Sequence, residues 1–474
     1  MATQAHEDAL HIAMIPWLAF GHMIPYLELA KHMAGRGHRI SFLSTPRNID
    51  RLPKLSPNLE ALVEFVKIEL PSVENLPENA EATSDLPYDK VQHLKVAYDL
   101  LQKPVAGLLA SLAPDWVLYD FAPYWVGPIA RKLGIKTAQF TIFTALTLVY
   151  AGPPWSSKGG DYRKKPEDFT VAPKWVPFHT SVAFSYFAIN KIFDDAIKMN
   201  KSGVSDFYRL GAGQEGADII ATRSSYEVEP EWLKVLEELM QKPVFPIGQL
   251  PPRSNDLNAE EENEAWKCIK QWLDSHNKGS VIYVAFGSEA KPSQDEATQI
   301  ALGLEDSGMP FFWVMRTQLG SSDKDRIKLP DGFEERVKGR GIVWSTWAPQ
   351  LKILAHDSVG GFLTHSGWSS VVEALSFGRA LILLSFLADQ GLNSKFLVEK
   401  KMGYAVPRNE FDGSFTSASV SESLRKVMVE KEGCYRVNTK MEEVIRDRQL
   451  QEGYVDNFLN YLKSTRPRRE RLLG

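Results

Sequence analysis

Short apolar runs alternate along the chain with longer segments whose apolar residues recur at helical spacing. The runs expected to be buried strands are residues 11–15, 39–43, 116–119, 136–140 and 218–222 in the first half, and 281–286, 310–315, 341–344, 359–363 and 380–384 in the second. Strands that are apolar throughout and separated by helices are typical of a parallel sheet covered on both faces. The pattern therefore predicts an α/β protein with doubly wound parallel sheets.

The two sets of strands are separated by a stretch of different composition. Residues 251–264 read PPRSNDLNAEEENE, which is polar, acidic and without apolar periodicity. A chain of 474 residues also exceeds the size at which one hydrophobic core stays efficient. We therefore expect two Rossmann-like domains, at residues 1–250 and 265–450, with a linker at 251–264.

The last predicted helix, near residues 454–462, has one apolar face. Val455, Phe458, Leu459 and Leu462 fall on that face at helical spacing. We expect it to pack on another part of the protein, within a C-terminal segment (451–474) that ends in a short basic tail.

Composition argues against several classes of protein. A net charge of −4 gives no electrostatic reason to bind nucleic acid or an anionic membrane. Two cysteines, Cys268 and Cys434, make neither a disulfide framework nor a cysteine-rich metal site, which fits a reducing compartment. The first ten residues contain no signal-peptide core, and the longest uncharged apolar run, 140–155, is too short to span a bilayer. We therefore expect a cytoplasmic protein.

Residues 347–390 carry the strongest candidate chemistry. Trp347 offers an aromatic plate for a base, and Asp389-Gln390 offers a carboxylate and an amide for sugar hydroxyls. Between them, the turn His365-Ser-Gly367-Trp368-Ser369-Ser370 follows an apolar strand and opens a helix. Ligands of doubly wound sheets bind outside the carboxyl ends of strands, and a helix N-terminus attracts phosphate without a lysine. One segment can thus hold all three parts of a nucleotide-sugar.

Two further features fit the same ligand. Glu373 lies one helical turn beyond Ser369-Ser370, within reach of a ribose, and Phe286-Gly287-Ser288 ends another strand with a second hydroxyl for the phosphates. Taken singly, Glu373 reads as a solvated helix residue and the Gly-Ser pair as a plain turn. The set of residues at these spacings is what favours a nucleotide-sugar site.

His22 and Asp120 are the candidate catalytic pair. His22 stands in a Gly/Pro turn after the first strand and before a helix, where it either caps that helix or acts chemically. Asp120 ends the strand 116–119 of the same predicted sheet, and an aspartate emerging from an apolar run is costly unless it is paired. A carboxylate that orients an imidazole and stabilises its charged form makes a general base.

Other cofactor motifs are absent from the sequence. No G-x-G-x-x-G follows the first strand, which argues against a nicotinamide-dependent enzyme, and no P-loop lysine is present. Asp323-Lys-Asp325 is a D-x-D, but it lies in a hydrophilic loop with no strand before it and reads as solvated. No His, Cys or carboxylate cluster has metal-ligand spacing, so no metal is expected.

The chain resembles the plant family 1 UDP-glycosyltransferases over nearly its whole length. The resemblance rests on the Gly21-His22 turn, Asp120, Phe286-Gly287-Ser288 and the box from Trp347 to Gln390. More narrowly, Pro16 to His22, Ser44 to Asn48 and Asp120 to Trp125 are similar to the branch that adds a sugar to a flavonoid, terpenoid or steroid glycoside. It implies the GT-B fold, two Rossmann-like domains facing across a cleft, with the last helix returning to the N-terminal domain.

The resemblance also implies a role for each matching residue. Those for the UDP-sugar are Trp347 on the uracil, Ala348 on the base edge, Gln350 and Glu373 on the ribose, His365, Ser370 and Ser288 on the diphosphate, and Trp368, Asp389 and Gln390 on the sugar. His22 is the implied base and Asp120 its partner. The donor would bind the C-terminal domain and the acceptor the N-terminal domain, with inversion in one displacement and no metal. The expected acceptor walls, which are equally readable as core, are Phe121, Tyr124, Trp125, Phe140 and Phe143.

Three positions depart from the common pattern of that family. Ser366 stands where cysteine is usual, Ser369 where asparagine is usual, and Ser385 where proline is usual. The first two are similar to members of the branch that use UDP-rhamnose, whereas Gln390 is also compatible with UDP-glucose. We expect UDP-rhamnose as donor, with UDP-glucose as the alternative, and a monomeric enzyme.

Two rival functions remain at this stage. A nucleotide-sugar epimerase would bind a UDP-sugar without an acceptor, and the aromatic N-terminal half argues against it. A catalytically silent UDP-sugar binder would lack the base, and His22 with Asp120 argues against that.

Overall fold

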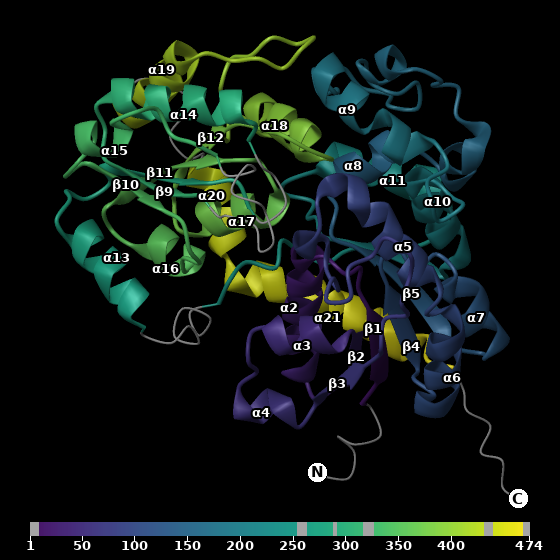
Figure 1. Ribbon diagram of the computed structural model, residues 1–474. Coiled ribbons are helices and arrows are strands. Elements are labelled where there is room, and N and C mark those ends of the chain that lie inside the picture. Colours follow the sequence, from purple (N-terminus) through teal and green to yellow (C-terminus); the bar gives the residue numbers. More distant parts are fainter. Residues whose placement is uncertain (1–8, 254–262, 288–291, 316–326, 431–438, 468–474) are drawn as a thin grey trace, which may run out of the picture. The chain divides into compact units, whose positions relative to one another are not determined.

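The computed structural model describes residues 9–253, 263–287, 292–315, 327–430 and 439–467. Contacts divide the chain into two compact units (Figure 1): a first unit of Met1–Tyr162, Asp194–Leu250 and Arg448–Gly474, and a second unit of Arg163–Phe193 and Pro251–Asp447. The second unit thus includes residues 163–193, which the sequence analysis placed with the N-terminal half. The functional roles expected for the two halves stay predictions.

The first unit is built on a parallel sheet of order β3-β2-β1-β4-β5-β6-β7. Its strands are β1 (His11–Ile15), β2 (Arg39–Ser44), β3 (Val63–Lys67), β4 (Trp116–Tyr119), β5 (Lys136–Thr141), β6 (Ile219–Thr222) and β7 (Val244–Pro246). Its helices are α2 (Phe20–Ala34), α3 (Pro46–Arg51), α4 (Pro57–Glu60), α5 (Val91–Asp99), α6 (Gln102–Leu112), α7 (Val126–Lys132), α8 (Ala145–Ala151), α10 (Asp206–Gly216), α11 (Pro230–Met240) and α21 (Arg448–Ser464). Helix α9 (Tyr186–Ile197) spans the boundary of the two units.

The second unit has a parallel sheet of order β10-β9-β8-β11-β12-β13. Its strands are β8 (Val281–Ala285), β9 (Phe311–Val314), β10 (Gly341–Trp344), β11 (Val359–Thr364), β12 (Ala380–Leu383) and β13 (Tyr404–Ala405). Its helices are α13 (Glu264–Asp274), α14 (Gln294–Ser307), α15 (Phe333–Arg336), α16 (Gln350–Ala355), α17 (Trp368–Ser376), α18 (Gln390–Glu399), α19 (Ser417–Met428) and α20 (Thr439–Arg446). Both sheets confirm the predicted doubly wound, Rossmann-like α/β fold.

The strand order reverses at the centre of each sheet. In the first sheet β1 pairs with both β2 and β4, and in the second β8 pairs with both β9 and β11. Such a reversal opens a crevice at the carboxyl ends of the two central strands, where ligands of this architecture bind. The fold alone therefore predicts that ligands bind near the loops that follow β1, β4, β8 and β11.

Helix α21 completes the core of the first unit, lying beside α2 (Figure 1). Val455, Phe458, Leu459 and Leu462 are all buried, which confirms the apolar face read from the sequence. The carbonyl oxygen of Leu462 also accepts a hydrogen bond from Trp116 Nε1 at 3.1 Å. Burying four large apolar side chains contributes on the order of 6–12 kcal/mol before the entropy of ordering the helix is subtracted.

Helix α2 begins earlier than the sequence indicates. His22 was expected in a turn before the helix, but the helix starts at Phe20, so His22 lies in its first turn and Pro25 lies inside it. The backbone N–H groups of His22 and Met23 both donate to the carbonyl of Ala19, which starts the helix without a side-chain cap. The helix ends at Ala34, and Gly35 follows it directly as the C-cap.

Candidate active site

His22 and Asp120 meet at the centre of the first sheet. His22 follows β1 and Asp120 follows β4, its neighbour, and His22 Nδ1 lies 2.7 Å from Asp120 Oδ2. The Asp120 side chain is fully buried, whereas that of His22 is 12% exposed. Backbone N–H groups of Trp17 and Phe121 donate to the two carboxylate oxygens at 3.0 and 2.7 Å. These contacts fix the carboxylate, and the carboxylate in turn fixes the imidazole ring through Nδ1, so the opposite ring nitrogen of His22, Nε2, is the atom that can take a proton.

Aromatic rings surround that histidine. The rings of Phe121 and Phe143 lie 5.5 and 5.6 Å from the His22 ring, centroid to centroid, and both side chains are part-exposed. Tyr124 is part-exposed as well. Phe140 is instead fully buried against Tyr26, and Trp125 is almost fully buried. The structure therefore corrects the expected acceptor walls: Phe140 and Trp125 pack in the core, and the other three reach the surface.

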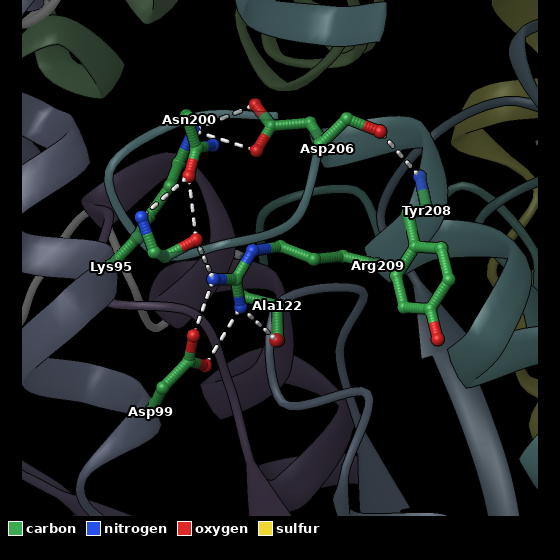
Figure 2. A network of polar contacts seen from close by, with 9 residues as sticks. Lys95, Asp99, Ala122, Asn200, Asp206, Tyr208 and Arg209 are labelled. Atoms are coloured by element: carbon green, nitrogen blue, oxygen red, sulfur yellow. Dashed lines mark hydrogen bonds and ion pairs between the residues drawn. The ribbon is translucent and has the colours of Figure 1, made fainter. Parts of the chain in front are cut away.

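An ion pair with a buried arginine holds the loop that carries Phe121 and Tyr124, and Figure 2 shows this pair. Arg209, on α10, has a fully buried side chain that pairs with both carboxylate oxygens of Asp99 and donates to the carbonyl of Ala122 at 3.0 Å. Asp99 also accepts from Trp125 Nε1 at 3.1 Å. Residues 121–125 are thereby tied to α5 and α10, which fixes the chain that follows Asp120. Sequence reasoning did not single out Arg209, because an arginine in a helix carries no sign of burial.

In the second unit, His365 directly follows β11 at the strand reversal. A Cβ atom added to Gly287 or Gly367 would come within 3 Å of the His365 ring, so both positions need glycine for the ring to fit. His365 keeps some exposed surface, yet burial lowers the pKa of its imidazole to about 4. The ring is therefore neutral near pH 7, and Thr364 Oγ1 lies 3.4 Å from its Nδ1. A neutral imidazole with one N–H can donate a hydrogen bond to phosphate, and His365 lies close before the N-terminus of α17, which favours anions.

The two residues expected on the ribose lie together. Gln350 opens α16, Glu373 lies on α17, and Gln350 Nε2 donates to Glu373 Oε2 at 2.6 Å and to Ser370 Oγ at 3.1 Å. Tyr283 donates to Gln350 Oε1 at 3.3 Å. A carboxylate paired with an amide in this way presents acceptors for a pair of hydroxyls.

Trp347 and Ala348 lie shortly before Gln350 in the chain. The Trp347 side chain is 49% exposed, which is unusual for so large an apolar group and leaves a ring face free for stacking. Its carbonyl accepts from Trp344 Nε1 at 3.2 Å, which holds the backbone in place. Ala348 is buried.

Two of the sugar-facing candidates, Asp389 and Gln390, lie after β12 at the start of α18, and the third, Trp368, begins α17. Gln390 Oε1 accepts from the backbone N–H of Phe386 and of Leu387, each at 3.0 Å, so its amide braces its own loop. Asp389 accepts from Asn393 Nδ2 at 2.9 Å. Trp368 is 5% exposed and its ring packs near Phe396, while Ser369 is part-exposed on the same helix. The Trp368 side chain is thus mainly packed.

Some predicted features lie outside the described residues. They are Ser288, the D-x-D of Asp323 and Asp325, and most of the predicted linker. Among the residues that the structure describes, no three or more His, Cys, Asp or Glu side chains are grouped as a metal ion would require. In the same part of the chain, no helix has the length and apolarity to cross a membrane.

Comparison with known proteins shows the family. Residues 239–451 match the family described as UDP-glucoronosyl and UDP-glucosyl transferase. The chain is 51% identical to UDP-glycosyltransferase 91A1 of Arabidopsis thaliana over 462 residues, covering 96% of this chain and 97% of that one. It is 41% identical to soyasaponin III rhamnosyltransferase of Glycine max, covering 98% and 97%. The protein therefore belongs to the plant family 1 UDP-glycosyltransferases and is a glycosyltransferase enzyme.

A solved structure supports the fold. The crystal structure of Arabidopsis thaliana UGT89C1 complexed with UDP-L-rhamnose superposes with a TM-score of 0.72 at 24% identity, covering 96% of this chain and 99% of that one. At this identity the likeness concerns the fold, which is the GT-B fold with two Rossmann-like domains that was expected from the sequence.

Proposed function

We propose that the protein transfers a sugar, with inversion, from a UDP-sugar to a hydroxyl of a plant specialised-metabolite glycoside, and that UDP-rhamnose is its preferred donor. The observation that carries the proposal is the 2.7 Å contact of His22 Nδ1 with the buried Asp120 carboxylate. A base is needed only if a hydroxyl is to be deprotonated, and a protein that merely stores a UDP-sugar has no use for one.

His22 takes the proton of the acceptor hydroxyl in this mechanism. Its Nδ1 is engaged by Asp120, so Nε2 is the atom that receives the proton, and the carboxylate stabilises the resulting imidazolium. The acceptor oxygen then attacks the anomeric carbon as the bond to the UDP oxygen breaks, which inverts the configuration in one step. Phe121, Tyr124 and Phe143 supply aromatic faces for the acceptor.

The second unit supplies the donor site. Trp347 stacks on the uracil, the Ala348 backbone reads its edge, and the Gln350–Glu373 pair holds the ribose. The diphosphate lies at the N-terminus of α17, where the residues proposed to contact it are His365, Gly367, Ser369, Ser370 and, by its place in the sequence, Ser288. Developing charge on the departing UDP is stabilised by these fixed donors in place of a metal.

The preference for rhamnose rests on the chemistry beside Asp389-Gln390. Rhamnose carries a methyl group where glucose carries a hydroxymethyl group, and a hydroxyl desolvated without a partner costs about 1–3 kcal/mol. Phe386, Leu387 and Ala388 offer no side-chain donor or acceptor there, and the Ser385 hydroxyl already donates to the Gln390 carbonyl at 3.0 Å. The soybean relative, named as a rhamnosyltransferase, supports the same donor. Its named substrate is a saponin, a class of glycosides, which supports a sugar-bearing acceptor.

A matrix of donors and acceptors tests the proposal. UDP-rhamnose and UDP-glucose are each combined with flavonoid, terpenoid and steroid aglycones and with their monoglycosides, and products are identified by mass. The expected result is a mass gain of one deoxyhexose on monoglycosides, with kcat/KM for UDP-rhamnose roughly 10-fold or more above UDP-glucose. A similar preference for UDP-glucose overturns the donor assignment, and better use of free aglycones overturns the acceptor assignment.

A further inference from the structure

Asn393 connects the two loops that carry the donor site. It lies on α18, one helical turn after Asp389, and its side chain is fully buried. Its Nδ2 donates to the Asp389 carboxylate at 2.9 Å and to the backbone carbonyl of Ser366 at 3.2 Å. Ser366 directly follows His365, so a single amide spans from the proposed phosphate loop after β11 to the proposed sugar-binding residues after β12.

The orientation of this amide follows from its partners. A carbonyl and a carboxylate are both acceptors, so the side-chain nitrogen must face them. The oxygen, Asn393 Oδ1, is then left buried without a hydrogen-bond partner among the described residues. An unsatisfied buried acceptor costs about 1–3 kcal/mol. An apolar side chain of similar size would therefore stabilise the fold about as well as this amide does. The contacts of Nδ2 are what the amide provides.

The Ser366 carbonyl is a fixed anchor for that nitrogen. Ser366 is fully buried and adopts a φ of +68°, a left-handed conformation that few residues other than glycine adopt readily. Its hydroxyl lies 3.3 Å from Ser385 Oγ, and the Ser385 hydroxyl donates to the Gln390 carbonyl at 3.0 Å, so Ser366 is the donor to Ser385. Two bridges, one from Asn393 and one from Ser385, thus join the same pair of loops.

Asp389 accepts a hydrogen bond from this amide with its carboxylate and does not cap its own helix. It stands at the N-cap of α18, yet its side chain makes no capping hydrogen bond to that helix. The Asn393 amide restrains the carboxylate instead, from a point fixed by the phosphate loop. We propose that Asn393 is a positioning residue, which sets the Asp389 carboxylate for the donor sugar relative to the diphosphate. This inference rests on the proposed function and names a residue that it does not include.

The test compares binding of UDP with binding of a UDP-sugar. Calorimetric Kd values are measured for UDP, UDP-rhamnose and UDP-glucose with wild type, Asn393→Ala, Asp389→Ala and the double variant. Asn393→Ala is expected to weaken the preferred UDP-sugar by roughly 10-fold, the value of a hydrogen bond to a charged group, and to weaken UDP much less. Because Asn393 acts through Asp389, adding Asn393→Ala to Asp389→Ala should cost little more.

Two further variants keep the test decisive. Asn48→Ala removes another fully buried asparagine, which donates to the Glu81 carbonyl in the first unit, and should leave the ratio of UDP-sugar to UDP affinity unchanged. If Asn393→Ala does not fold, Asn393→Asp keeps the shape of the side chain and replaces the donor by an acceptor, so the same selective loss is expected.

The outcomes separate this inference from the proposed function. The positioning role is overturned if the losses of UDP-sugar affinity add up in the double variant, or if UDP and the UDP-sugar lose affinity equally. In both cases the wild type still binds its donor, so the proposed function stands. A wild-type protein that binds neither UDP-sugar overturns the proposed function and this inference together.

Discussion

Gln350 Nε2 and Glu373 Oε2 lie 2.6 Å apart although 23 positions separate the two residues in the chain. Helices α16 and α17, on either side of β11, bring them together, and the same amide nitrogen donates to Ser370 beside the proposed diphosphate site. This hydrogen bond restrains the orientation of both side chains, so the pair presents its oxygens in a fixed geometry.

Glu373→Ala should therefore weaken UDP binding. Loss of a charged acceptor for ribose hydroxyls is worth about 1.5–3 kcal/mol, so we expect Kd for UDP to rise by roughly 10-fold or more in calorimetry. Glu422→Ala, which changes an exposed glutamate on α19, is the matched control and should bind UDP like wild type. Unchanged UDP affinity in Glu373→Ala would remove the ribose assignment.

Chelation should leave activity intact. Phosphate binding is assigned to a helix N-terminus and a neutral histidine, and the described residues contain no metal-binding group of acidic, His or Cys side chains. We expect the initial rate of transfer to be the same with excess EDTA as without it. A loss that Mg²⁺ or Mn²⁺ restores would point back to Asp323 and Asp325.

The free energy of unfolding should fall as the pH drops from 6.5 toward 4. Burial lowers the pKa of both His38 and His365 to about 4, from an ordinary value of 6.5. Between these values the unfolded chain binds more protons than the folded one, so acid favours unfolding there, and the stability gained from keeping each imidazole neutral is complete only above 6.5.

Urea titrations at pH 7, 6 and 5 measure this dependence. His365→Asn should flatten the slope by up to about 1.4 kcal/mol per pH unit, the value of one proton. His179→Asn changes an exposed histidine and should leave the slope as in wild type. An unaltered slope in His365→Asn would show that the ring is already protonated in the folded protein or never protonates in the unfolded one.

Site residues that directly follow a strand could be predicted from the sequence. Asp120 was found because a carboxylate that ends an apolar run needs a partner, and the parallel register then places it beside the segment after β1. Gln350 and Glu373 were expected together only because the family resemblance implies that both hold the ribose. Strands β3, β7 and β13 were missed. Strands β7 and β13 are only three and two residues long, and β3 reads VEFVK, which is not apolar throughout.

Features that depend on tertiary packing were not predicted. Nothing in the helical pattern of α18 marks Asn393 as buried, and nothing in α10 marks Arg209 as the partner of Asp99. The grouping of residues 163–193 with the second unit is also a matter of contacts, such as the hydrogen bonds of Thr180 and Ser181 with Glu399. From the sequence, Phe140 and Trp125 could equally line the acceptor site or pack in the core, and only their burial in the structure distinguishes the two.

The most direct test of the account is turnover by His22→Ala, measured with a saturating UDP-sugar and an accepted monoglycoside and read by mass. Loss of the general base should lower kcat by roughly 10²–10⁴-fold, while the Kd of UDP, whose proposed contacts lie in the second unit, changes little. His179→Ala is the matched control and should turn over like wild type. Near-normal turnover by a folded His22→Ala protein would contradict the account.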